Sequence, residues 1–445
     1  MEVSIRPMVA PGAAPDTMRV WAGVFGYGAA LPALTWTADG QDVPAEAVRP
    51  LAPAAAFAPR LSAATGVFDL PGFGTTSRTV KAKAGTAESP GVPMRPVPAA
   101  VPPGPSLSLT VLLTSCFYQR KDKAGRAAPV VAGITPPPDL TLCVGDQVYL
   151  DQPPLVFDTD MADLAAVFEQ QYRTNFVLPG SLAAILRTAP VAAIPDDHEY
   201  WNNYPHRSAM TLQSLPDPPN NWSTAARAMY DAFQLGRPGE YSYAVDVDPV
   251  SFFLMDNRTF RTRDGRHTLG ANDRAAYDAW VARVVTDGLA PVLVTGPSLF
   301  QPAKHGWARL TDRNMANYGD YKVVMAGLLQ LAQAGKDVLA LTGDVHYPRL
   351  VELRSAGGTI REVIASPTSL VWGSEPGAAK QLEGVYTEAK LSGRRVWPDS
   401  PAIRGDNVAV LRFTRSDDRQ LRLDLEFRMI QQGTTYRLEP IRLRY

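Results

Sequence analysis

The sequence predicts an α/β protein in which a small β-sandwich precedes a larger domain of layered sheets and helices. Three observations predict this fold class. The composition changes at a proline-rich stretch, residues 85–108. After this stretch, short apolar runs alternate with helix-like patterns, as in layered α/β domains. Polar side chains that can bind metals follow several of the apolar runs, which is where open α/β sheets place their sites.

Residues 1–100 are expected to form the small β-sandwich domain. Short segments with β-like composition occur before the proline-rich stretch, at residues 18–27, 34–38, 67–70 and 77–83. Residues 85–108 contain too many prolines for a helix or a central strand, so they are interpreted as a semi-rigid linker. The domain boundary is therefore placed near residue 100.

Residues 101–445 are expected to hold the larger α/β domain. Its predicted strands are short apolar runs at 108–115, 140–144, 191–194, 251–255, 290–295, 338–342 and 362–365. Several are rich in valine, isoleucine and leucine without clean alternation, as expected for strands buried on both faces. Helix-like patterns lie between them, at 160–175, 181–188, 224–235, 271–285 and 318–334. Near the end, residues 407–414 and 421–429 alternate as antiparallel strands do.

The composition limits the partners of the chain. The 44 basic and 44 acidic residues give a formal net charge of zero, so no general attraction to nucleic acid or anionic membranes is expected. No apolar run is long enough to predict a membrane span, and two cysteines are too few for a disulfide framework. The N-terminus lacks a signal-peptide pattern. A cytoplasmic location is therefore expected, or a periplasmic or secreted one if the chain is the mature form of a longer precursor.

Five of the predicted strands are followed by residues that suit a metal site. They are Cys116 in TSC; Asp146, Tyr149 and Asp151 in GDQVYLD; Asp197, His198 and Asn203 in DDHEYWNN; Asp256 and Arg258 in MDNR; and Asp344 and His346 in GDVH. Each motif alone has a structural explanation, such as a turn, a buried thiol or a surface ion pair. The conjunction of five strand ends predicts a joint site, and the glycines before Asp146 and Asp344 suit a close backbone approach there.

The set TSC, GDQVY, DDHE with two asparagines, MDNR and TGDVH resembles the motifs of PhoD-like (alkaline phosphatase D) enzymes, a branch of the calcineurin-like metallophosphatases. The resemblance covers residues 110–370, where the order and spacing of the motifs agree. It implies a four-layer α/β/β/α sandwich with a small N-terminal β domain. It also implies the hydrolysis of phosphodiesters or phosphomonoesters, and hence a small phosphate-ester substrate.

The resemblance also assigns roles to residues. It implies two ligand sets that share Asp146 as the bridging carboxylate: Cys116, Tyr149 and His346 for one metal, and Asp197, Asn203 and Asp344 for the other. Asn202, which is adjacent in sequence, stays an alternative to Asn203. His198 follows Asp197 as the catalytic histidine follows the ligand residue in related motifs.

The chemistry of the two sets predicts different metals. Thiolate, phenolate, imidazole and carboxylate ligands suit Fe³⁺, whereas a set made only of oxygen ligands suits Ca²⁺, Mg²⁺ or Mn²⁺. The resemblance implies iron with calcium, and Zn²⁺ or Mn²⁺ are alternatives. The mechanistic hypothesis is attack on phosphorus by a hydroxide that bridges the metals, with His198 as general acid. Arg258, or secondly Arg120, would stabilise charge on the phosphate oxygens.

Two alternatives remain open. A nucleotide or nucleic-acid phosphodiesterase could use the same site, although the neutral charge argues against long polynucleotides. A metal-stabilised binding protein without catalytic activity is the second alternative, and the intact His198 argues against it. The segments 206–222 and 373–398 are predicted to form a lid, with Trp222, Trp307 and Trp372 either at the entrance or in the core.

Overall fold

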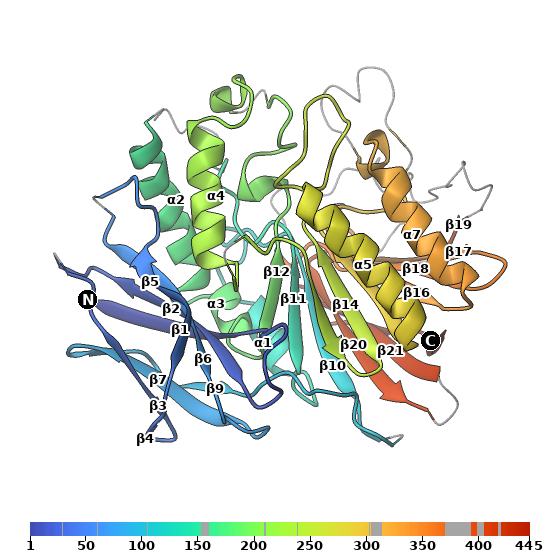
Figure 1. Ribbon diagram of the computed structural model, residues 1–445, viewed down its shortest axis with the longest axis horizontal. Coiled ribbons are helices and arrows are strands. Elements are labelled where there is room, and N and C mark those ends of the chain that lie inside the picture. Colours follow the sequence, from blue (N-terminus) through green and yellow to red (C-terminus); the bar gives the residue numbers. More distant parts are fainter. Residues whose placement is uncertain are drawn as a thin grey trace.

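The protein is described by a computed structural model (Figure 1). The described residues are 1–28, 30–59, 61–104, 106–152, 160–208, 211–237, 239–301, 303, 314–369, 393–397, 405–416 and 420–445. They form a mixed α/β protein with two large sheets, one smaller sheet and helices, which confirms the predicted α/β class.

The largest sheet has eleven strands among the described residues, and its centre is parallel. Strands β10, β11 and β12 run parallel to one another, and β1 pairs with β12 in the same direction. The strands of the main path, in spatial order, are β22 (Thr435–Arg437), β21 (Gln420–Met429), β20 (Asn407–Arg415), β10 (Leu109–Thr114), β11 (Leu140–Val144), β12 (Val191–Ile194), β1 (Glu2–Met8), β2 (Met18–Phe25), β6 (Ala63–Leu70) and β5 (Glu46–Pro53). Strand β23 (Ile441–Arg444) pairs with β21.

The second large sheet has seven described strands. Its central strands β14, β15, β16 and β18 are parallel, so their carboxyl ends meet at one edge. In spatial order the strands are β13 (Tyr243–Val247), β14 (Val250–Met255), β15 (Ala290–Thr295), β16 (Val338–Thr342), β18 (Thr359–Ile364), β17 (Arg349–Arg354) and β19 (Gly393–Trp397).

Helices lie against both large sheets (Figure 1). The described helices are α1 (Ala127–Ala132), α2 (Met161–Phe176), α3 (Ser181–Ile185), α4 (Asn221–Phe233), α5 (Ala271–Asp287) and α7 (Tyr321–Gln333), with short 3₁₀ turns η1 (Asp197–Glu199), η2 (Leu212–Ser214) and η3 (Met315–Asn317). All five predicted helices are confirmed within a few residues at their ends. Strands β1, β5, β13, β17, β19, β22 and β23 were not predicted, and neither was the short helix α1.

Side chains of the central strands alternate between two cores. In β11, Cys143 contacts the core shared with α2 and α4, whereas Leu142 and Val144 contact the core between the two large sheets. A third core joins the seven-stranded sheet to α5 and α7. Both faces of the central strands are therefore covered, because successive side chains point to opposite faces. This double burial explains why their sequences are apolar without alternation.

The N-terminal strands belong to two sheets. A small sheet contains β3 (Leu34–Ala38), β4 (Gln41–Asp42), β7 (Arg78–Ala84), β8 (Ala87–Glu88) and β9 (Val92–Met94). It packs on β1, β2 and β6 through an apolar cluster that includes Ile5, Val20 and Trp36. Since β1 also pairs with β12, the sheet continues across residue 100, and the domain boundary there stays a prediction. The expected linker also contributes β8 and β9 to the small sheet.

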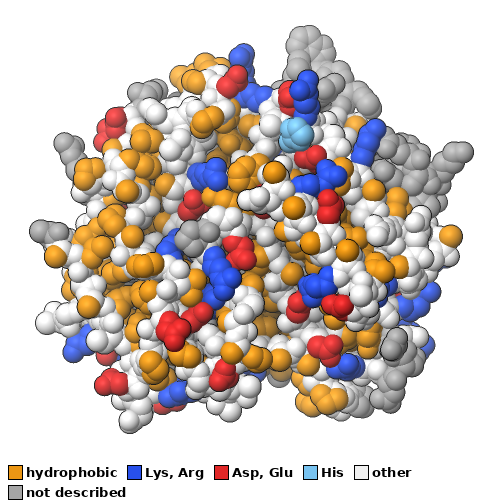
Figure 2. All heavy atoms as spheres, in the orientation of Figure 1, with side chains coloured by type: hydrophobic (Ala, Val, Ile, Leu, Met, Phe, Trp, Pro, Cys, Tyr) orange, Lys and Arg blue, Asp and Glu red, His pale blue; other side chains and the backbone are white. Residues whose placement is uncertain are grey.

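The surface on the face drawn in Figure 2 carries basic and acidic side chains interspersed, in keeping with the formal net charge of zero. Among the described helices, none combines the length and the hydropathy that crossing a bilayer requires.

Candidate metal centre

The predicted ligands follow strands of both large sheets. Cys116 and Asp146 each come two residues after the ends of β10 and β11, and Asp197 comes three residues after β12. On the second sheet, Asp344 and His346 follow β16. Backbone hydrogen bonds join the first two loops, from Cys116 N–H to the Gly145 carbonyl (3.1 Å) and from Phe117 N–H to the Asp146 carbonyl (2.7 Å).

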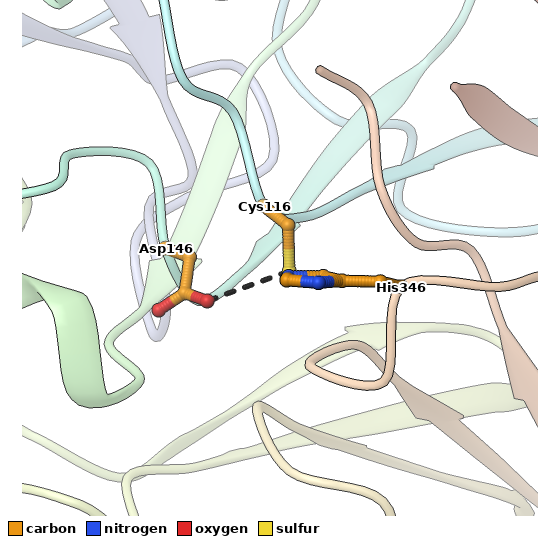
Figure 3. A group of neighbouring side chains, drawn as sticks. All are labelled: Cys116, Asp146 and His346. Carbon is orange, nitrogen blue, oxygen red and sulfur yellow. Dashed lines mark hydrogen bonds between the residues drawn. The ribbon is translucent and has the colours of Figure 1, made fainter. Parts of the chain in front are cut away.

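Three groups of side chains bring potential ligand atoms within 4.8 Å of one another. The groups are Cys116, Asp146 and His346; Asp146, Asp197 and His198; and Asp196, Asp197 and Asp344. Figure 3 shows the first group, whose side chains point toward one another from three separate loops. Because Asp146 and Asp197 are each shared by two groups, the clusters are contiguous, and each could hold a metal ion.

Backbone strain is concentrated at these residues. Among the described part of the chain, six residues other than glycine have positive φ angles, and five are predicted ligands: Cys116 (53°), Asp146 (58°), Asn203 (67°), Asp344 (68°) and His346 (58°). The left-handed region is unfavourable for residues with a Cβ, so such conformations mark functional positions when they cluster. Strain at five positions on four loops therefore supports a single site.

Gly145 allows the loop after β11 to approach the loop after β12. Its φ angle is 86°, and a Cβ added there would lie 2.4 Å from the Cβ of Asp196. The Gly-Asp sequence predicts a close approach of the backbone to a ligand, which stays a prediction, whereas the close approach seen at Gly145 is to Asp196. Its neighbour is another loop of the protein, because the polar loops of adjacent strands pack on each other at the sheet edge.

Glu199 fixes the two loops that carry Asp146 and Asp197. Its fully buried carboxylate accepts backbone N–H groups from Asp146 (2.9 Å), Gln147 (2.7 Å) and Asp196 (2.8 Å). Burial raises the pKa of Glu199 to about 7. From the sequence, Glu199 is expected, together with Asp197, to favour the imidazolium form of His198; its contacts with these backbone N–H groups were not predicted.

His198 is held by Asp151. Its Nδ1 lies 2.7 Å from Asp151 Oδ1, and its ring centroid lies 4.2 Å from that of Tyr149. Burial lowers the pKa of His198, but the carboxylates of Asp151, Asp197 and Asp146 raise it, and the net pKa is well above the usual value. Asp151 was noted at a strand end without a role; the structure places it against the imidazole.

Asn203 lies beside Asp197, since its backbone N–H donates to Asp197 Oδ2 (2.5 Å). The N–H of Asn202 instead donates to Asp151 Oδ2 (2.8 Å). Of the two adjacent asparagines, Asn203 is therefore the one whose backbone contacts a predicted ligand of the second metal.

Arg258 is engaged in a buried ion pair with Asp196. Its Nε lies 2.5 Å from Asp196 Oδ1, its Nη2 also contacts this oxygen, and its Nη1 donates to the Tyr204 carbonyl (2.9 Å). From the sequence, Arg258 could also have paired with Asp256, but its guanidinium pairs with Asp196, and Asp256 accepts the backbone N–H groups of Arg258 and Thr259. Nearby Asp197 and Asp344 also raise the pKa of Arg258.

The residues present fit bound cations. Burial, followed by the carboxylates of Asp197, Asp196 and Glu199, raises the pKa of Asp146 well above its usual value, although His198 opposes this. A nearby cation would offset that cost of concentrating buried negative charge. The buried Tyr149 Oη has no hydrogen-bond partner among the described residues, which leaves it available as a ligand.

The imidazole of the first group also matches this interpretation, whereas the thiol would lose its proton only on binding a cation. Burial raises the pKa of Cys116 and lowers that of His346 to about 4, which leaves the imidazole neutral as a metal ligand must be. The thiol of Cys116 lies 3.4 Å from Asp146 Oδ2 and accepts from Ser366 Oγ (3.2 Å). Ser366 was not identified from the sequence, where a lone serine carries no signal.

Part of the predicted entrance is tested by the structure. Trp222 is buried in the core, where it packs on Phe168 and donates to the Tyr200 carbonyl (2.6 Å), so its placement at the entrance is wrong. Trp307 and Trp372 lie outside the described residues. So does the segment 373–398, except for residues 393–397.

No family model matches the chain. No curated protein sequence matches it either. Among solved structures, the chain aligns with one described as "Structure of PhoD", over 98% of this chain and 88% of that chain, with a TM-score of 0.65 and 14% identity. The fold is PhoD-like. At this identity the likeness concerns the fold, and the PhoD-like fold brings the loops after β10, β11, β12 and β16 together as described above.

Proposed function

We propose that the chain is a metal-dependent phosphoesterase that hydrolyses phosphodiesters, phosphomonoesters or both. The observation that carries this proposal is the contiguous set of three ligand groups sharing Asp146 and Asp197. The PhoD-like fold supports it, since the solved structure with this fold is described as PhoD. We further propose that the two large sheets and their flanking helices are the four-layer sandwich of that family.

Seven side chains would hold two cations. Asp146 would bridge them; Cys116, Tyr149 and His346 would complete the first site, and Asp197, Asn203 and Asp344 the second. The first set suits Fe³⁺ and the second suits Ca²⁺, with Zn²⁺ or Mn²⁺ as alternatives. We add Asp196 to these residues. Its carboxylate belongs to the same group of potential ligands as Asp197 and Asp344, and it also pairs with Arg258.

When bound, two cations supply Lewis acidity that makes water a better nucleophile near neutral pH and offsets charge on the phosphate. His198 would give a proton to the leaving oxygen. Asp151 occupies its Nδ1, which leaves Nε2 for this transfer and holds the ring in one orientation. Arg258 would act as the cation beside the second site, with its guanidinium fixed by Asp196.

Metal content and turnover, measured together, test this proposal. We would analyse the metals in protein purified without added metal and assay bis(p-nitrophenyl) phosphate hydrolysis, for the wild type and Asp146→Asn. Loss of a residue that supports a ligand typically costs 10–100-fold, so loss of the shared ligand should cost at least about 100-fold in rate. The variant should also lose both metals.

Asp231→Asn is the matched control, because Asp231 is a largely buried carboxylate that is outside the three ligand groups. It should keep the metals and the rate. An Asp146→Asn protein with full metal content and full activity would refute the proposed centre. The cytoplasmic location and the absence of a nucleic-acid partner stay predictions.

A further inference from the structure

A cavity of about 620 Å³ lies beside the candidate metal centre and has a basic wall. We call it the basic cavity; its defining residues are Tyr118, Arg120, Lys121, Lys123, Arg126 and Gln152. Four cationic side chains line it, against two acidic ones, Asp122 and Asp406. This excess is local, because the whole chain has equal numbers of basic and acidic residues.

The basic cavity adjoins the candidate metal centre through Tyr118, which lines the cavity and contacts the predicted ligand Tyr149. Tyr118, in the cavity wall, follows Cys116 by two residues, and its ring centroid lies 5.3 Å from that of Tyr149. The ring of Tyr149 in turn lies against that of His198, tilted by 38°. Gln152, also in the wall, donates its backbone N–H to the Tyr149 carbonyl (3.2 Å). A substrate held at the metals could therefore extend one group further into the cavity.

Three of the four cations of the cavity have no charged partner among the described residues. Arg120, Lys123 and Arg126 are exposed, and their side chains have no hydrogen bond or ion pair with the described residues. Asp122 forms no ion pair with these three side chains; its Oδ1 accepts the backbone N–H of Arg126 (2.7 Å) and closes a turn. Exposed cations that converge on a cavity suit an anion with several oxygen atoms, above all a phosphate.

We propose that the basic cavity binds a second phosphate group of the substrate, so that preferred substrates are phosphodiesters carrying another phosphate close to the scissile one. This assignment rests on the proposed function of the metal centre. It also gives Arg120 a different role from the sequence hypothesis: Arg120 contacts the second phosphate, and Arg258 remains near the reacting one. A phosphorylated nucleotide and a polymeric phosphodiester share the required chemistry.

The test uses two substrates that differ by one phosphate. They are the p-nitrophenyl ester of thymidine 5′-phosphate and the same compound with an additional 3′-phosphate. We would measure kcat/KM for both with the metal-loaded protein. A charge-assisted contact to the second phosphate predicts a preference of roughly tenfold for the 3′-phosphorylated compound. A short polymer with repeated phosphodiester groups, compared in parallel, distinguishes nucleotide from polymeric substrates.

The double variant Arg120→Gln/Arg126→Gln removes two cavity charges, and Lys83→Gln/Arg442→Gln is its control. Lys83 and Arg442 are also exposed cations without an ion pair among the described residues, and they lie on β7 and β23. The cavity variant should lose the preference, so that the ratio of the two kcat/KM values falls to about twofold or less. The control should keep the wild-type ratio.

A ratio that is unchanged in the cavity variant, or that falls equally in the control, would overturn the assignment. Failure of the proposed function has a different result, namely that the wild type hydrolyses neither compound. In that case, calorimetric titration of the 3′-phosphorylated compound still tests the cavity without turnover. Affinity that is tenfold weaker in the cavity variant than in the control would support the phosphate site, and equal affinity would refute it.

Discussion

Replacing Glu199 tests how the polar loops of the candidate centre are held in place. The fully buried carboxylate accepts the backbone N–H groups of Asp146, Gln147 and Asp196, and it also accepts the side-chain amide of Gln234 at 3.4 Å. We compare Glu199→Gln with Glu199→Ala. Both variants remove the same charge, so their difference depends on how many buried donors lose an acceptor, to which alanine adds the cost of the cavity that it leaves.

The structure gives the size of this difference. In the glutamine variant, one amide oxygen can replace Oε2, which accepts from Asp146 and Asp196. The new amide nitrogen would face Gln234, whose buried Oε1 has no hydrogen-bond partner in the described part of the chain and can accept from it after a flip of the amide. Only the N–H of Gln147 then loses its acceptor, whereas alanine leaves all three N–H groups without one.

Two additional unsatisfied donors cost about 2–6 kcal/mol, since each buried group costs about 1–3 kcal/mol. The alanine variant should therefore be less stable than the glutamine variant by at least this amount. This is a large part of the total stability of a typical domain, which is about 5–15 kcal/mol.

Urea unfolding at pH 8, with a metal chelator present, measures the difference without a contribution from metal binding. Glu88→Ala is the control, because Glu88 is half-exposed and pairs with Lys81 on the surface. Its free energy of unfolding should change by less than about 1 kcal/mol. If the free energies of unfolding of Glu199→Ala and Glu199→Gln differ by less than about 1 kcal/mol, Glu199 is not the acceptor on which the buried N–H groups of these loops depend. The reasoning would then be wrong.

Three further predictions concern charge and metals. Burial raises the pKa of Asp231 from 3.8 to about 6, so the folded state binds its proton more tightly between these pH values. The free energy of unfolding should therefore fall by up to about 3 kcal/mol as pH rises through this window, and parallel profiles for the wild type and Asp231→Asn would contradict this. Asp151→Asn should lower the rate about 10–100-fold while the metal content stays the same, because Asp151 orients His198; a normal rate would remove that role. A chelator should lower the Tm of the wild type but leave that of Asp146→Asn unchanged, and equal shifts would show that the stabilising metal binds elsewhere.

Much of the fold could be predicted from the sequence because the signals are local. The central strands appear as apolar runs, since both their faces are buried. Strand β1 was missed even though its residues are almost all buried, because the buried polar residues Ser4 and Arg6 interrupt its apolar pattern. Besides its neighbour β2, it pairs at Met8 with β12, which is far away in the sequence. Pairing between such distant segments depends on tertiary packing, which propensity does not encode.

The sequence by itself determined the types of residue at the strand ends, including Cys116, Asp146 and His346, because the polar motifs are contiguous in the chain. Only the tertiary structure decided which side chains face each other. Asp151 contacts His198, while Glu199 turns away to accept backbone N–H groups, and Arg258 pairs with Asp196. These contacts depend on where separate loops converge and on which buried polar groups must find hydrogen-bond partners. The sequence of a single segment contains neither kind of information.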